Sequence, residues 1–390
     1  MLERGSDGML RLPALATAHS HAFQRAMRGR AQRPLGPASD DFWSWRAQMY
    51  SALSTLTPES IHDMSLVAFR ELASRGVHTV GEFHYVHHQP DGTHYDDRTC
   101  MADAVVSAAK LAGLRIALLR AAYHRAGAGL ALDRVQRRFY DADVDEVLGD
   151  VSALRGKWSQ DSDVVIGLAM HSVRAVPQSW LRPLSEYALA HALPLHMHVS
   201  EQAREVDECI AETGRRPVEL LAEKGVLSDR FVAVHATHLV AHEANLLGQA
   251  KSFACICPTT ERDLGDGLPD ISALRGAGVR LCTGVDSYVV VDPIEDLRSL
   301  ETHERLRTHS RVTFRPVGLT PAEQLWGEGS LQGARACGFA DAGAQAVIRR
   351  DHPALELVRD EELLDAIVFG APGTIVDRTE RLARAGHRER

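Results

Sequence analysis

Apolar residues along this chain gather in short runs of strand length, and longer segments with helical spacing separate those runs. The eight runs are residues 10–18, 76–85, 113–123, 163–172, 193–201, 230–238, 251–259 and 279–287. The helical candidates, with apolar residues three or four positions apart, are 58–75, 100–112, 180–192, 217–225, 242–250 and 293–307. Several of the short runs are apolar throughout, as in parallel strands that are buried on both faces. Eight strand–helix units in succession predict an α/β chain folded as a (β/α)₈ barrel of the TIM type.

We expect this barrel to occupy residues 10–326. A short extension of helical or irregular structure is expected to occupy residues 327–390. No repeat, low-complexity tract or long polar linker interrupts the chain, so the sequence contains no flexible hinge.

Polar and titratable side chains are concentrated at the carboxyl ends of the short runs. A barrel builds its active site on the face formed by these strand ends and by the loops that follow them. The pattern of the fold and the placement of the reactive groups therefore agree. The residues at or just after the run ends are His19, His21, Glu82, His84, Tyr123, His171, His198, Glu201, His235 and Asp286.

Several of these residues suit a metal ion. His19 and His21 lie two positions apart in a strand, so both imidazoles share one face, and such a pair suits one divalent cation. The fifth run contains His196 and His198, of which His198 is nearer the strand end. A buried carboxylate at Asp286 costs free energy unless a cation or hydrogen bonds compensate it. Each residue alone could be an ordinary core or rim residue, but together they indicate a metal centre.

Composition and charge exclude several classes of protein. With 44 Lys and Arg against 52 Asp and Glu, the net charge is −8, which argues against nucleic acid or an anionic membrane as a partner. No apolar run approaches the ~20 residues that a membrane helix needs. The start, MLERGSDGML, does not resemble a signal peptide. The six cysteines are too few for a disulfide framework, so we expect buried thiols and a cytoplasmic location.

Longer motifs add a resemblance that covers roughly residues 12–310. The chain resembles the mononuclear aminohydrolase branch of the amidohydrolase superfamily, and within it the formimidoylglutamate deiminases of histidine degradation. The stretches that carry this resemblance, in order, are HSHAFQRAMRG (19–29), DFWSWRAQMY (41–50), EFHYVHHQPDG (82–92), HSVRAV (171–176), HVSEQ (198–202), GRRP (214–217), VHATH (234–238), PTTERDLGDG (258–267) and DSYVVVDPIEDLR (286–298).

The resemblance implies a reaction and a set of site residues. The reaction is hydrolysis of N-formimino-L-glutamate to N-formyl-L-glutamate and ammonia. The implied ligands of one Zn²⁺ per chain, or alternatively Fe²⁺, are His19, His21, His198 and Asp286. The implied catalytic pair is Glu201 and His235. The implied substrate contacts are Gln24, Arg46, Tyr85, His171 and Arg174.

Physical chemistry supports these roles. A zinc ion held by three imidazoles and a carboxylate lowers the pKa of a water ligand to about 7. Asp286 can accept the proton of that water, and Glu201 can pass a proton to the leaving nitrogen. A small-molecule substrate with two carboxylates suits the guanidinium forks of Arg46 and Arg174. Trp43 and Trp45 either cover the site as an apolar lid or pack within a loop, whereas Glu82 and His84 are expected to support the metal ligands.

The chain departs from the family at two points. The small β-sandwich that usually accompanies the barrel is expected to be absent or vestigial, because His19 lies too near the start. Tyr288 stands where the family has a histidine, which would alter either the support of the metal ligands or the substrate pocket. Alternatives are therefore an aminohydrolase that acts on another formimino compound, amidine or amino-heterocycle, including one in biosynthesis, and a non-catalytic barrel. We expect a homodimer, as is common for such barrels.

Overall fold

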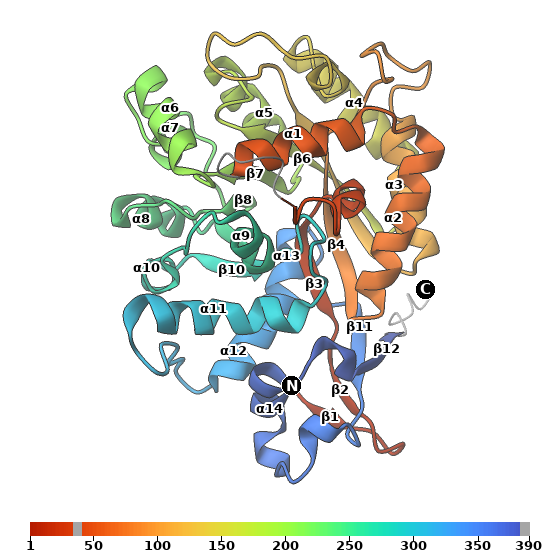
Figure 1. Cartoon of the computed structure of the whole chain (residues 1–390), viewed down its shortest axis with the longest axis vertical. Helices are drawn as coiled ribbons and strands as arrows, with labels where there is room; N and C mark the ends of the chain where they lie inside the picture. The colour runs from red at the N-terminus through yellow and green to blue at the C-terminus, as the bar shows by residue number, and fades with distance from the viewer. Residues whose placement is uncertain (34–40, 383–390) are drawn as a thin grey trace, which may run out of the picture.

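A ring of eight parallel strands surrounded by helices forms the upper part of the computed structural model (Figure 1), which describes residues 1–33 and 41–382. Each predicted run contains one barrel strand, so the (β/α)₈ prediction is confirmed. The strands, which neighbour one another in chain order, are β3 (Leu15–Ser20), β4 (Val77–His84), β5 (Arg115–Ala122), β6 (Val164–Ser172), β7 (Leu195–Val199), β8 (Phe231–His235), β9 (Phe253–Ile256) and β10 (Arg280–Thr283). Every residue of β4 and β5 is buried, as expected for strands covered on both faces.

The ring closes between β3 and the segment that follows β10. The backbone N–H of Asp286 donates to the carbonyl of His19 at 3.1 Å, and the N–H of His21 donates to the carbonyl of Asp286 at 3.0 Å. One residue before Asp286, the N–H of Val285 donates to the hydroxyl of Thr17 at 2.8 Å. Closure of the barrel therefore places the predicted metal-ligating residues of its first and last strands side by side.

The helices between successive strands cover the outside of the barrel, and all six predicted helical segments contain one. Their bounds are α2 (Pro58–Ala73), α3 (Cys100–Leu111), α4 (Val144–Trp158), α5 (Gln178–Ala190), α6 (Ala203–Thr213), α7 (Pro217–Glu223), α8 (Ala241–Gln249), α9 (Pro258–Leu264), α10 (Ile271–Gly276) and α11 (Pro293–Thr308). The start of α2 shows why the sequence folds in this way: the Thr57 hydroxyl accepts from the N–H of Ser60, and Pro58 occupies the first turn. No helix in the described ranges has both the length and the apolar character needed to cross a membrane.

Helix α1 (Phe42–Leu53) lies in the loop after β3, across the carboxyl end of the barrel (Figure 1). The Asp41 side chain caps it by accepting from the N–H groups of Trp43 and Ser44 at 3.0 Å each. The spacing of apolar residues alone does not predict this helix, because its buried residues are few. Its position brings the motif at 41–50 over the barrel mouth.

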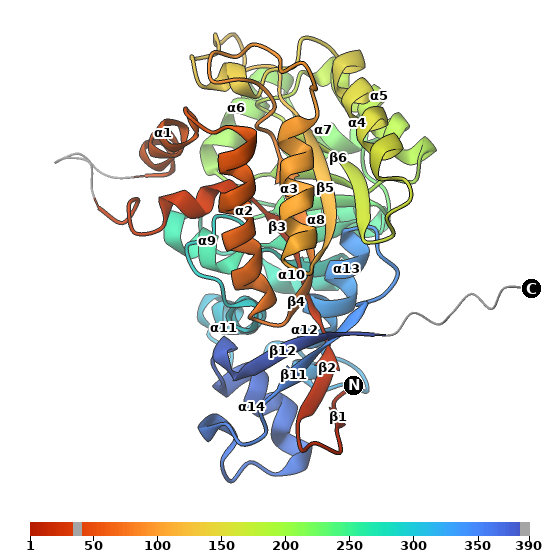
Figure 2. The ribbon, with the colours of Figure 1, turned by 90° about the vertical axis from the view of Figure 1, so that its right-hand side faces the viewer.

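Both ends of the chain meet in a second, smaller sheet at the amino end of the barrel (Figure 2). Its antiparallel strands, in spatial order, are β1 (Glu3–Arg4), β2 (Leu10–Pro13), β11 (Ala344–Ile348) and β12 (Val376–Arg381). Helix α14 (Leu363–Gly370) lies in the connection between the last two strands. A single sheet is the reduced form of the accessory sandwich that the resemblance implies.

The expected domain boundaries need correction at both ends. Residues Leu10–Pro13 pair with β11 rather than with the barrel. The apolar run at 10–18 therefore belongs to two strands, which are separated only by Ala14. Residues 327–382 are not only helical or irregular, because they contain β11 and β12; the remaining residues of the expected extension, 383–390, lie outside the described ranges.

The domain boundary expected after residue 326 is also wrong, because the helical segment that begins before this position continues past it, beneath the barrel. This segment consists of α12 (Pro321–Gly327), a π-helical turn at Glu328–Gln332 and α13 (Gly333–Ala336). It is attached to the strands by two hydrogen bonds. The indole N–H of Trp326 donates to the carbonyl of Pro13 at 2.9 Å, and Nε2 of His196 lies 2.9 Å from the carbonyl oxygen of Ala336.

Two glycines provide a matched test of packing in the barrel. A Cβ atom at Gly81 in β4 would collide with the carbonyl oxygen of Ala18 and lie 2.9 Å from Sγ of Cys337, whereas at Gly149 in α4 it would meet nothing within 4 Å. We expect Gly81→Ala to lower the free energy of unfolding by about 1–3 kcal/mol, since the strands must move apart. Gly149→Ala should raise it by about 0.5–1 kcal/mol. Chemical denaturation measures both changes, and equal stabilities would contradict the described barrel packing.

Candidate active site

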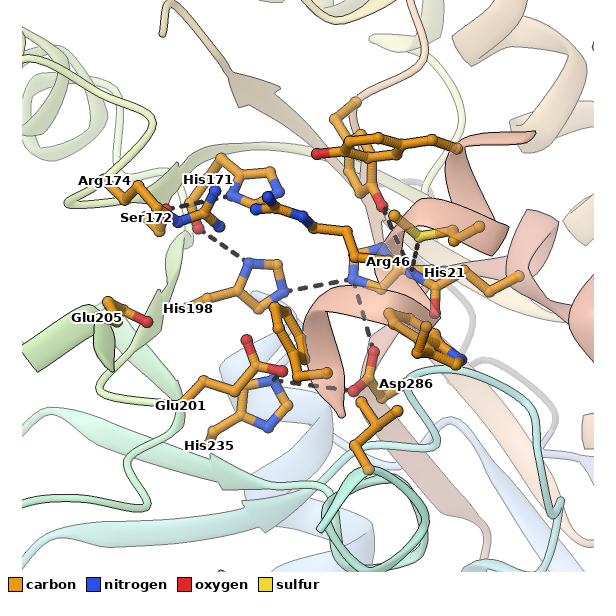
Figure 3. A pocket seen from close by; sticks show the side chains of 17 residues that line it. His21, Arg46, His171, Ser172, Arg174, His198, Glu201, Glu205, His235 and Asp286 are labelled. Atoms are coloured by element: carbon orange, nitrogen blue, oxygen red, sulfur yellow. Dashed lines mark hydrogen bonds and ion pairs between the residues drawn. The ribbon is translucent and has the colours of Figure 1, made fainter. Parts of the chain in front are cut away.

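A pocket at the carboxyl end of the barrel brings most of the predicted site residues together (Figure 3). Its volume is about 530 Å³ when the solvent space at its open side is included. Of the predicted metal-ligating, catalytic and substrate-contacting residues, all except His19 line it, and His19 lies fully buried beneath. Helix α1 covers one side of the pocket. Its lining residues are Phe42, Trp45, Arg46, Met49 and Tyr50.

Three imidazole rings converge at the base of this pocket. Nε2 of His198 lies 3.2 Å from Nε2 of His19 and 3.3 Å from Nε2 of His21. Nδ1 of His21 lies 2.9 Å from the carbonyl oxygen of Phe83, and Nδ1 of His198 lies 2.9 Å from that of His171. These carbonyls require Nδ1 to donate, which leaves a lone pair on Nε2 of each neutral ring. Facing lone pairs repel one another unless a cation lies between them, so this arrangement fits a metal ion.

Asp286 completes the cluster with oxygen. Its Oδ1 atom lies 3.4 Å from Nε2 of His19 and 3.6 Å from Nε2 of His21, and Oδ2 lies 3.8 Å from Nε2 of His235. Burial raises the pKa of Asp286, but the hydrogen bond from His19 and the charge of His235 outweigh burial and lower it overall. Burial lowers the pKa of His19 to about 3, so its ring is neutral at pH 7. Imidazole and carboxylate donors are those that zinc and ferrous iron accept.

Beside this cluster, Glu201 and His235 form a charged pair. The Glu201 carboxylate lies 3.7 Å from Nε2 of His235, while Nδ1 of His235 lies 3.2 Å from the carboxylate of Glu261. Burial opposes a charge on His235, but Glu201 and Glu261 outweigh it and raise the pKa of His235 to about 10. Burial also raises the pKa of Glu201. The pair can therefore hold and exchange a proton at the edge of the imidazole cluster.

The backbone at these strand ends adopts a conformation that side chains other than glycine rarely take. The φ angles of Ser200, His235 and Asp286 are +53°, +68° and +53°. Left-handed backbone at such residues costs free energy and persists only where the surrounding structure enforces it. Here it turns the chain out of the strand while the side chains of His235 and Asp286 stay directed into the pocket.

Two arginines occupy the upper part of the pocket. Arg46, from α1, lies 4.5 Å from the ring centre of Trp43, and Arg174, from the loop after β6, lies 5.7 Å from the same ring. Neither guanidinium has a carboxylate within 4.0 Å in the described part of the chain, and Nη1 of Arg46 is buried without a hydrogen-bond partner there. Burial, together with the charge of Arg174, lowers the pKa of Arg46. The pocket therefore holds two guanidinium groups that no carboxylate of the described residues pairs with at close range, and Glu201 and Glu205 act on Arg174 only from farther away.

Neutral polar groups line the wall between the arginines and the imidazoles. Nε2 of Gln24 lies 3.4 Å from the hydroxyl of Tyr85 and donates to the sulfur of Met49, while its Oε1 atom is buried without a partner among the described residues. The ring of His171 packs 5.2 Å from that of Tyr85. These groups have weak or missing partners and are free to bind a ligand.

Tyr288 lies outside the pocket, beneath the strand that carries His19 and His21. Its hydroxyl lies 2.8 Å from that of Ser20, which in turn donates to Glu82. Glu82 also accepts from the N–H of Ala22 at 2.8 Å, and burial raises its pKa to about 8. The Tyr288 substitution therefore changes the support of the first strand and leaves the pocket lining untouched.

The structure adds acidic residues that the sequence analysis does not single out. Glu205 lines the pocket, and burial raises its pKa to about 7. Glu261 and Asp266 lie near Glu201 and His235, in the motif at 258–267. That motif contributes to the resemblance, but its position in the chain does not indicate which pocket residue its acids contact.

A barrel with imidazole, carboxylate and guanidinium groups gathered at the carboxyl ends of its strands defines an enzyme class: hydrolases built around a site able to hold a metal ion. The chain belongs to the amidohydrolase family, whose sequence pattern matches residues 10–350. This membership, together with deiminase and deaminase relatives, indicates a hydrolase that acts on C–N bonds.

Two of the similar proteins come from Pseudomonas aeruginosa. Its formimidoylglutamate deiminase is 38% identical over 303 residues, which are 77% of this chain and 66% of that protein. Its 8-oxoguanine deaminase is 28% identical over 341 residues, 86% of this chain and 71% of that protein.

Solved structures agree on the fold. An amidohydrolase from Brucella melitensis superposes with a TM-score of 0.84 at 32% identity, over 94% of this chain and 84% of that one. A zinc-bound adenosine deaminase from Xanthomonas campestris superposes with a TM-score of 0.79 at 20% identity, over 95% and 79% of the two chains. At this lower identity, the second structure supports the fold alone.

Two histidines of β7 allow a matched test of metal binding. We expect elemental analysis to find about one divalent metal ion per chain, because the cluster offers one four-donor site. His198→Gln should lose most of this metal. His196→Gln should keep it, because that ring points to the carbonyl of Ala336 at the opposite end of the barrel. Equal metal content in the two variants would contradict the proposed ligand set.

Proposed function

We propose that this protein is a metal-dependent deiminase that hydrolyses N-formimino-L-glutamate to N-formyl-L-glutamate and ammonia. The observation that carries the proposal is the pair of guanidinium groups, Arg46 and Arg174, which have no ion-pair partner among the described residues and lie above the imidazole–carboxylate cluster in one pocket. A substrate with two carboxylates supplies the missing negative charges, and guanidinium forks suit planar anions. The likeness to a formimidoylglutamate deiminase supports the same substrate.

The metal ligands in this proposal are His19, His21, His198 and Asp286, and the ion is Zn²⁺, with Fe²⁺ as the alternative. The facing ε nitrogens support a cation at this position, as does the ionised state of Asp286. When bound, zinc makes a water molecule acidic near neutral pH and so supplies the nucleophile.

The side chains of the pocket perform the proton transfers. Addition of water to the formimino carbon requires a proton acceptor for the water and a proton donor for the imino nitrogen, which must leave as ammonia. The Oδ2 atom of Asp286 accepts the first proton, because Oδ1 faces His19 and His21 while Oδ2 points toward His235 and the pocket. Glu201, ionised beside His235 at the start of the cycle, takes up a proton of the water and delivers it to the departing nitrogen. His235, fixed by Glu261, polarises the imino nitrogen or holds the attacking water.

The remaining contacts orient the substrate. Arg46 and Arg174 bind its two carboxylates, while Gln24, Tyr85 and His171 line the path of its chain toward the cluster. The reaction would belong to histidine degradation. We also propose a homodimer, which light scattering of the purified protein tests directly.

The first test concerns the proton carrier. We expect Glu201→Gln to keep its metal and to lower kcat by about 10²-fold or more, the usual effect of removing a positioned acid or base. The matched control is Glu208→Gln on α6, because Glu208 pairs with Arg204 at the surface. Ammonia release and elemental analysis are measured on both variants. Near-normal turnover of Glu201→Gln would show that another group carries the proton.

The second test concerns the substrate. Wild type should prefer formimino-glutamate over the formimino derivative of a monocarboxylate amino acid. Arg46→Met and Arg174→Met should each lower kcat/KM for the dicarboxylate by about 10- to 100-fold, and at least one should erase the preference. Lysine substitutions should rescue only in part, since an ammonium group lacks the guanidinium fork. Arg204→Met is the control, because Arg204 stacks on Trp43 at 4.4 Å from the solvent side.

The same panel tests the alternative substrate class. An aminohydrolase for neutral amidines or amino-heterocycles would gain nothing from two arginines in its pocket. If wild type ignores formimino-glutamate and deaminates a neutral compound, the substrate proposal is wrong, although the assigned metal site and proton carrier can still hold.

A further inference from the structure

Asp266 is a buried acid beside the catalytic pair to which the mechanism above gives no role. It follows α9, between Gly265 and Gly267, whose φ angles of +70° and +120° turn the chain so that the side chain faces inward. Its exposed fraction is 3%. One oxygen of Asp266, one oxygen of Glu201 and one nitrogen of His235 all lie within 4.8 Å of one another.

The two oxygens of Asp266 have different surroundings. Oδ1 accepts a hydrogen bond from the side-chain amide of Gln202, the residue after Glu201. Oδ2 is buried and has no hydrogen-bond partner among the described residues. A carboxylate oxygen buried without a donor is costly, whereas a protonated oxygen can itself donate to the neighbouring carboxylate.

Two ionised carboxylates cannot share so small a buried space, because like charges at this distance raise the pKa of one of them. Burial and the charge of Glu201 raise the pKa of Asp266. Nε2 of His235 lies 3.7 Å from the Glu201 carboxylate, whereas Oδ2 of Asp266 has no hydrogen-bond donor among the described residues. The proton of the pair therefore belongs on Asp266.

We propose that Asp266 is a positioning residue for Glu201: it stays neutral, directs its acid proton toward the Glu201 carboxylate, and leaves Glu201 as the single anion facing His235. Through Gln202 it also fixes the start of α6, to which Glu201 is attached. The inference rests on the role proposed for Glu201, but it does not depend on which amidine or amino-heterocycle the enzyme deaminates.

Two substitutions of Asp266 test this inference, because one keeps a neutral hydrogen-bond donor and the other keeps only the shape of the side chain. Asp266→Asn keeps an acceptor for Gln202 and replaces the acid proton by an amide N–H, so we expect kcat within about threefold of wild type. Asp266→Leu has a similar shape but cannot donate, and we expect kcat to fall about 10- to 100-fold with little change in KM. The controls are Asp263→Asn and Asp263→Leu in α9, three residues earlier, because Asp263 is paired at the surface with Gln32. All variants are checked for thermal stability and metal content.

Infrared spectroscopy gives a second readout that needs no substrate and holds even if Asp266→Leu does not fold. At pH 7 the wild type should show a carboxylic-acid C=O band that is absent from Asp266→Asn and retained in Asp263→Asn. An unchanged carboxylic-acid band would overturn the proposal, as would Asp266→Asn being as slow as Asp266→Leu, or full turnover of Asp266→Leu. If wild type ignores formimino-glutamate, the kinetic series is run on the compound that it does hydrolyse, and only the proposed substrate fails.

Discussion

The carboxyl end of this barrel depends on one constraint, which is the electrostatic repulsion between the facing ring nitrogens of its histidines. The ε nitrogens of His198 and His21 lie 3.3 Å apart, and the carbonyls that bind their Nδ1 atoms leave no proton to bridge the gap. Such crowding persists because each ring is fixed by a strand, and because β3 is bonded to the segment after β10 through His19 and Asp286. The fold thus holds together a cluster that needs positive charge at its centre. The left-handed backbone at Asp286, which costs free energy, is one of the conformations that this cluster requires.

Charge is arranged in layers around that cluster. Guanidinium groups from α1 and from the loop after β6 occupy the upper part of the pocket, while carboxyl groups from α9 and from the segments after β7, α9 and β10 surround the base. An anionic substrate would meet positive charge first, and only its reacting end would approach the acids. Burial keeps most of these groups away from water, so each contributes more strongly than it would at the surface.

The barrel could be predicted from the sequence because its strands and helices have local periods, and the site because parallel strands end at the same face. The family resemblance, rather than the strand ends alone, proposed eleven site residues, and ten of them line one pocket with His19 below them. The small sheet could not be predicted, because the pairing of Leu12 with Ala346 spans most of the chain and leaves no periodic signal. The approach of Asp266 to Glu201 was equally hidden, since it depends on how two separate loops fold toward each other.

The small sheet has a consequence for how the protein is made. Strand β3, which contains His19 and leads directly into His21, follows β2, and among the described residues β2 pairs only with the two residues of β1 and with β11, more than three hundred positions along the chain. The carbonyl of Pro13 is held by Trp326, and the N–H of Ala14 by the carbonyl of Ala344. A ribosome therefore releases the first two histidines of the cluster before the other residues of the site, yet their segment is anchored on both sides only after some three hundred further residues have emerged. During translation, the earliest part of the site to be made is the last to be secured.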